Sequence, residues 1–128
     1  MQERILVVDD DVDIRNLLTT TFSRANYDVT CVNSAEDVLA IQHDEVFSLY
    51  FIDLQLPGMN GLELCREIRE DDATSILIAI TAHVSIFQIV DAREAGFDDL
   101  YYKPFKSDEL VEAAKDAFKR MERWTKMT

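Results

Sequence analysis

Short apolar runs and amphipathic segments alternate five times along the chain. Residues 4–8 (RILVV) form a continuous apolar run, which is typical of a strand covered on both faces of a parallel sheet. Similar runs follow at 27–32, 49–52, 76–80 and 100–102. The run at 27–32 alternates apolar and polar positions, and this pattern favours a place nearer the edge of the sheet.

Residues with helical periodicity separate these runs. After the first run, apolar residues recur at three- and four-residue spacing, which predicts a helix with one inward face. The residues expected on that face are Ile14, Leu17, Leu18, Phe22 and Ala25. Ser34 and Asn60 each precede an acidic residue by three positions, a pattern typical of helix N-caps.

The last two predicted helices differ in how clear their apolar stripe is. A helix over 85–95 should end at Gly96 and turn Ile86, Ile89 and Val90 inward, while Phe87 lies off this stripe. Phe87 is therefore either a candidate for a partner surface or a residue that folds back onto its own domain. The final helix should be capped by Ser107, with an inward stripe of Leu110, Val111, Ala114, Ala117, Phe118 and Met121.

Five strand–helix units in this order predict an α/β fold with a parallel sheet between two helix layers. Right-handed crossovers leave few topologies, and the flavodoxin-like (βα)5 sandwich with strand order 2-1-3-4-5 fits five repeats of this length. The 128 residues suit one domain, which we expect to span 1–121. Residues 122–128 would be the end of the last helix or the start of a linker.

The chain is strongly acidic, with 25 acidic and 13 basic residues and a formal charge of −12. Such a surface repels nucleic-acid phosphates and anionic lipid, so we expect no direct nucleic-acid or membrane binding by this domain. No apolar run approaches the ~18 residues that span a bilayer, and aspartates begin too early for a secretory signal. A cytoplasmic location is expected. Cys31 and Cys65 are far apart and should be buried, reduced thiols.

Polar residues follow several of the predicted strands at their carboxyl ends, where ligands of parallel sheets bind. These residues are Asp9, Asp10, Asp11, Asp53, Thr81 and Lys103. Each type is common alone, as a helix cap or a surface charge, and capping is the favoured role for Asp11. Their coincidence at four strand ends instead favours a shared chemical site.

Carboxylates placed close together repel one another unless a cation offsets their charge. Mg²⁺, or Mn²⁺ in its place, prefers such hard oxygen ligands. Asp10 and Asp53 are the expected direct ligands, Asp9 would bind directly or through water, and the Gln55 carbonyl would complete the protein's share. A carboxylate at such a site can also attack a phosphoryl group, with Lys103 and the Thr81 hydroxyl holding its oxygens.

Four ordered segments carry a family resemblance that extends over 4–121. They are 5–11 (ILVVDDD), 53–61 (DLQLPGMNG), 81–82 (TA) and 103–105 (KPF). The chain resembles response regulator receiver domains of two-component signal transduction, in particular the chemotaxis-regulator type. The resemblance implies that Asp53 accepts a phosphoryl group from the phosphohistidine of a sensor histidine kinase or phosphotransfer protein.

The resemblance also implies Mg²⁺ at Asp9, Asp10 and Asp53, and a cis bond between Lys103 and the following proline. A receiver domain is a phosphoacceptor switch that catalyses its own phosphotransfer and slow autodephosphorylation, rather than an enzyme acting on a separate substrate. Such domains often signal to an output domain or partner through the face built by the last two helices and the last strand.

Three positions bear on switching and on dephosphorylation. Leu100 stands where receiver domains usually place the aromatic partner of the switch residue, here Thr81, so we expect phosphorylation to be coupled to the output face differently or less strongly. Gln55 and His83 lie two residues after Asp53 and Thr81, where family members control the approach of water. His83 would orient a water, restrict its access, or simply be an exposed loop residue.

Three other functions compete with this interpretation. A Mg²⁺-dependent aspartyl-phosphate phosphatase of the haloacid dehalogenase type needs a second carboxylate two residues after its nucleophile, where Asp53 has Gln55. Asp9 does have Asp11, but Asp13 stands where that family expects Thr or Val. A flavin-binding module needs a phosphate loop rich in Ser, Thr or Gly after the first strand. A receiver-like interaction domain without phosphorylation would not need the reactive residues present here.

Overall fold

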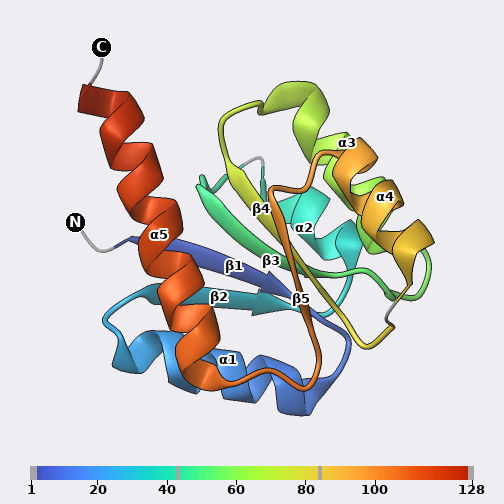
Figure 1. The fold of residues 1–128 in the computed structure, drawn as a ribbon, viewed down its shortest axis with the longest axis horizontal. Helices are drawn as coiled ribbons and strands as arrows, with labels where there is room; N and C mark the ends of the chain where they lie inside the picture. The colour runs from blue at the N-terminus through green and yellow to red at the C-terminus, as the bar shows by residue number, and fades with distance from the viewer. Residues whose placement is uncertain (1–2, 43, 84, 127–128) are drawn as a thin grey trace.

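The computed structural model describes residues 3–42, 44–83 and 85–126, and Figure 1 shows the arrangement of its elements. The strands are β1 (Arg4–Val8), β2 (Asp28–Val32), β3 (Leu49–Asp53), β4 (Ile76–Thr81) and β5 (Asp99–Tyr102). The helices are α1 (Val12–Arg24), α2 (Ala35–Ile41), α3 (Gly61–Asp71), α4 (Ile86–Ala95) and α5 (Ser107–Lys126). The strand bounds agree with the sequence prediction to within one residue.

The strands form one parallel sheet in the order β2-β1-β3-β4-β5, which confirms the predicted flavodoxin-like topology. Helices α1 and α5 cover one face, and α2, α3 and α4 cover the other (Figure 1). β2 lies at an edge, as its alternating pattern indicated. Within the described ranges, no helix is both long and apolar enough to cross a membrane.

The pleat of the buried strands divides the core into two layers. In β1, Ile5 and Val7 pack toward α1 and α5, while Leu6 and Val8 pack toward the other three helices. β3 and β4 alternate in the same way. The alternation explains why the central strands are continuous apolar runs, because both of their faces are covered.

Local signals at the helix ends are confirmed. Asp11, Ser34 and Asn60 each accept a hydrogen bond from a backbone N–H in the first turn of the following helix. α4 ends at Gly96, whose φ of 114° lies in the left-handed region that glycine tolerates. Both cysteines are free, as expected, but only Cys65 is buried, while Cys31 is partly exposed. Burial raises the pKa of Cys65 to about 11.

Two predicted inward stripes are partly wrong. Ile86 is 68% exposed and Val90 is 46% exposed, because α4 turns its small residues Ala92 and Ala95 toward the core instead. Leu17 of α1 is 42% exposed, because Leu18 faces the core and successive residues of a helix are about 100° apart. The side chains of Phe87 and Ser107, for which a surface and a capping role were considered, lie outside the described part of the structure.

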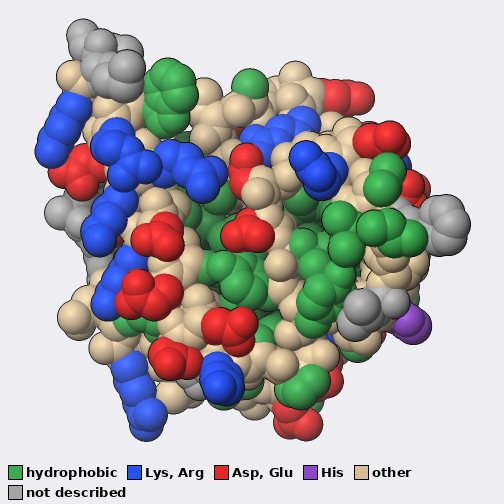
Figure 2. All heavy atoms as spheres, viewed as in Figure 1, with side chains coloured by type: hydrophobic (Ala, Val, Ile, Leu, Met, Phe, Trp, Pro, Cys, Tyr) green, Lys and Arg blue, Asp and Glu red, His purple; other side chains and the backbone are tan. Residues whose placement is uncertain are grey.

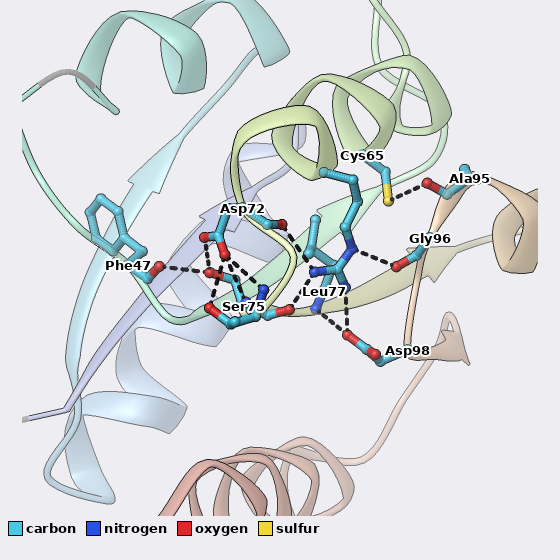
Figure 3. Close-up of polar contacts among 10 residues, drawn as sticks. Phe47, Cys65, Asp72, Ser75, Leu77, Ala95, Gly96 and Asp98 are labelled. Atoms are coloured by element: carbon cyan, nitrogen blue, oxygen red, sulfur yellow. Dashed lines mark hydrogen bonds and ion pairs between the residues drawn. The ribbon is translucent and has the colours of Figure 1, made fainter. Parts of the chain in front are cut away.

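Arg69 of α3 contacts the segment before β4 and the segment between α4 and β5, near the amino ends of these strands. Figure 3 shows its partners Ser75, Gly96 and Asp98. Its guanidinium donates to the Gly96 carbonyl at 2.9 Å and to the Ser75 carbonyl at 2.6 Å. It also pairs with Asp98 Oδ2 at 2.8 Å, and that oxygen accepts the N–H of Leu77 at 2.9 Å. The C-terminal end of α4 is thereby fixed to α3 and to the start of β4.

Replacing Arg69 with methionine should destabilise the fold, because three carbonyls lose the guanidinium donor and Asp98 loses its ion pair. We expect Arg69→Met to lower the free energy of unfolding by about 2–3 kcal/mol. The matched control is Arg66→Met on the exposed side of the same helix, which should stay within about 0.5 kcal/mol of the wild type. Urea unfolding measures both, and equal losses would contradict the assigned role of Arg69.

Candidate functional site

The register of the sheet brings the predicted site residues to one edge. Asp9 directly follows β1, and Asp53 ends β3 beside Ile80 of β4. Thr81 is the next residue of β4, and its carbonyl accepts the N–H of Lys103 at 2.7 Å. Residues from the whole length of the chain therefore converge at the carboxyl ends of neighbouring strands, as expected for a ligand site in this fold.

Lys103 holds two buried carboxylates together. Its Nζ lies 2.8 Å from Asp9 Oδ2 and 3.1 Å from Asp53 Oδ2. The other oxygens accept backbone N–H groups at 2.9 Å, Asp9 Oδ1 from Asp11 and Asp53 Oδ1 from Gln55. Asp9 Oδ2 is buried and, despite its ion pair, has no hydrogen bond of good geometry from any described residue. This oxygen can therefore also bind a cation.

The acidic residues at this edge fit a divalent cation. Asp9, Asp10 and Asp53 each offer a carboxylate oxygen, and these oxygens lie within 4.8 Å of one another. Together with Lys103, these three aspartates carry three negative charges and one positive charge, so a divalent cation would neutralise the group. Asp10 is exposed, which leaves room for the waters that Mg²⁺ retains. The oxygen-only donor set also matches the preference of Mg²⁺.

The ionisation of the site reflects its burial. Burial and, to a smaller extent, the nearby Asp9 raise the pKa of Asp53, while the Gln55 N–H and Lys103 lower it, and the net result is a pKa of about 6. Burial alone would lower the pKa of Lys103, but Asp9 and Asp53 outweigh burial and raise it above its ordinary value. Lys103 is therefore a permanent positive charge, while Asp53 can gain or lose a proton within the physiological range.

Thr81 is fully buried beside this cluster and is surrounded by polar groups. Its hydroxyl has two acceptors, Gln55 Oε1 at 2.9 Å and Gln88 Oε1 at 3.3 Å. The backbone N–H of His83 donates to Thr81 Oγ1 at 3.1 Å, and the His83 side chain is exposed. Leu100 does not join this group: it is partly buried in the core layer under α2, α3 and α4.

Comparison with known proteins identifies the family. A model of the response regulator receiver domain matches residues 5–115. The chain belongs to this family. It is 35% identical to the DNA-binding response regulator MtrA of Mycolicibacterium smegmatis over 95% of its length and 53% of that protein. It is 37% identical to the transcriptional regulatory protein ResD of Bacillus subtilis over 93% of its length and 49% of that protein.

The receiver domain thus spans about half the length of these curated relatives. A solved structure of a CheY-like receiver domain protein from Methanospirillum hungatei is similar, with a TM-score of 0.91 and 29% identity. That match covers 96% of this chain and 98% of the other. A role in two-component signalling follows, and the phosphatase alternative is not favoured. The Lys103–Pro104 bond is cis, as the resemblance implied.

Two residues near the site were not singled out in the sequence. Arg15 of α1 donates to the backbone carbonyl of Asp9 at 2.8 Å and so helps to fix the loop after β1. Gln88 reaches Thr81 from α4. Neither carries a sequence signal of its own, because a lone arginine or glutamine on a helix usually belongs to a solvated face.

The raised pKa of Asp53 predicts how stability depends on pH without metal. The folded protein keeps this proton to higher pH than the unfolded chain, so the free energy of unfolding falls as pH rises from about 4 to about 6. Asp53→Asn carries no such charge. Its stability advantage over the wild type should grow across that range and then level off, at about 1–3 kcal/mol.

Urea unfolding in a metal chelator between pH 4.5 and 7.5 measures this difference. Asp44→Asn, at an exposed position, serves as the control for the substitution itself. A difference between Asp53→Asn and the wild type that did not change with pH would contradict the assigned burial and repulsion.

Proposed function

We propose that Asp53 accepts a phosphoryl group from the phosphohistidine of a sensor histidine kinase or phosphotransfer protein. The observation that carries this proposal is a buried carboxylate, ion-paired to Lys103, within a cluster that fits a divalent cation. Asp9, Asp10 and Asp53 would hold Mg²⁺ or Mn²⁺, with the Gln55 carbonyl as a further ligand. The domain acts as a phosphoacceptor switch rather than as an enzyme on a separate substrate.

Each side chain has a separate part in the transfer. An Asp53 oxygen forms the new P–O bond while the P–N bond to the donor imidazole breaks, and the electron pair of that bond returns to the imidazole. The cation, when bound, neutralises charge that develops on the phosphoryl oxygens. Lys103 and the Thr81 hydroxyl donate hydrogen bonds to those oxygens. With a pKa of about 6, Asp53 is mostly ionised, and therefore nucleophilic, at neutral pH.

The face built by α4, β5 and α5 is the proposed surface for an output domain or partner protein. Figure 2 shows hydrophobic side chains gathered over α4 and β5, with acidic side chains along the neighbouring part of α5. Ile86 and Val90 contribute exposed apolar area there. We propose that residues 1–121 form the receiver unit, although α5 itself continues to Lys126.

The acidic surface bears on the other partners. With a charge of −12, the domain is better suited to controlling a protein partner than to touching nucleic-acid or membrane phosphates itself. A cytoplasmic location follows from the proposed donor, because histidine kinases draw their phosphoryl group from cytoplasmic ATP.

Incubation with a small phosphodonor, with and without Mg²⁺, tests the proposal. Intact-mass analysis should show one phosphoryl adduct that requires the metal, is stable in acid and is lost in base. Asp53→Asn should abolish it, while Asp44→Asn at an exposed position should retain it. An adduct that persisted in Asp53→Asn would contradict the proposal. Steady turnover of a phosphate ester would instead support the phosphatase alternative.

Gln55 and His83 should control how long the phosphoryl group lasts. Gln55 Oε1 accepts a hydrogen bond from Thr81, and the backbone N–H of His83 donates one to the same hydroxyl, so we expect both residues to lie near the path of water to Asp53. If they restrict water, Gln55→Ala and His83→Ala should each shorten the lifetime of the adduct several-fold. If His83 orients the attacking water, His83→Ala should lengthen it. A lifetime unchanged in both variants would contradict any role in dephosphorylation.

A further inference from the structure

The Thr81 hydroxyl has more acceptors than it can satisfy. It carries one proton, and the carbonyl oxygens of Gln55 and Gln88 both lie within hydrogen-bond distance, at 2.9 and 3.3 Å. The His83 N–H already occupies a lone pair of the hydroxyl oxygen. Any new acceptor that takes this proton therefore removes it from the two glutamines together.

Among the described side chains, those at the end of α4 are more deeply buried than those at its beginning. Its last turn carries the buried Ala92 and Ala95, and Arg69 binds the Gly96 carbonyl that follows (Figure 3). In the first half, residues 86–90, no described side chain is fully buried, and Ser85 makes no side-chain cap. Among the described residues, Gln88 supplies the one side-chain hydrogen bond between this half and the rest of the domain.

Leu100 cannot replace this connection. It is partly buried in the same core layer as α4, but a leucine side chain has no group that can bond to a hydroxyl. A change in the hydrogen bonding of Thr81 would therefore reach α4 through the hydrogen bond to Gln88.

We propose that Gln88 couples the phosphorylation state of Asp53 to α4. A phosphoryl oxygen is a charged acceptor, and hydrogen bonds to charged acceptors are roughly twice as strong as those to neutral ones. The Thr81 proton therefore transfers its hydrogen bond from the glutamines to the phosphoryl group. Gln88 loses its donor, and the first half of α4, which carries the exposed Ile86 and Val90, is released. This inference rests on the proposed phosphorylation of Asp53.

Hydrogen–deuterium exchange of residues 86–91, measured with and without a small phosphodonor and Mg²⁺, tests the coupling. In the wild type, phosphorylation should speed exchange there roughly three- to tenfold, which is the effect expected from losing the stability contributed by one hydrogen bond. Gln88→Met keeps the length of the side chain but removes the acceptor. It should show the faster exchange already without the phosphodonor, and phosphorylation should then change it less than twofold.

Two further variants serve as controls. Gln88→Glu retains an acceptor oxygen at the same reach and should keep the slow exchange of the unphosphorylated state. Asp91→Asn, at an exposed position of the same helix, should behave as the wild type. If Gln88→Glu exchanged as fast as Gln88→Met without the phosphodonor, the hydrogen bond would not be the link.

Intact mass measured on the same samples separates this inference from the proposed function. If Gln88→Met formed the adduct and still showed the full exchange response, the role of Gln88 would be contradicted, but the proposed phosphorylation of Asp53 would not. The absence of any adduct in the wild type would overturn the proposed function, and the coupling with it.

Discussion

The ion pairs of Lys103 with Asp9 and Asp53 are the interaction on which the rest of the site depends. Two buried carboxylates repel each other, and one lysine offsets only part of that repulsion. The remaining negative charge, together with the exposed Asp10, would be neutralised by a divalent cation, which these carboxylates could hold. In the proposed transfer, the charge that arrives with a phosphoryl group at Asp53 would meet donors already in place, Lys103 and the Thr81 hydroxyl.

The fold and most of the candidate site could be predicted from the sequence. The central strands are buried on both faces and so read as continuous apolar runs, and their order in a parallel sheet follows from a few handedness rules. Once the order is known, residues that follow the strands must meet at one edge, whatever the details of packing. For this reason Asp9, Asp53, Thr81 and Lys103 could be expected to lie together before any distance was known.

What could not be predicted depends on the rotation of single helices. α4 carries apolar residues around much of its circumference, and only packing decides that Ala92 and Ala95 face inward while Ile86 is exposed. That rotation also directs Gln88 toward Thr81. Hydrogen bonds between side chains on different elements leave no periodic pattern in the sequence, so the connection between the site and α4 was visible only in the structure.

The central claim, that Asp53 carries the phosphoryl group, is tested most directly by locating that group on the chain. Borohydride reduces an aspartyl phosphate to homoserine, which leaves a permanent mark at the modified residue. Peptide sequencing by mass spectrometry after phosphorylation with Mg²⁺ should find homoserine at position 53 and at no other aspartate. Homoserine at position 9 or 10, with position 53 unmodified, would contradict this account of the site.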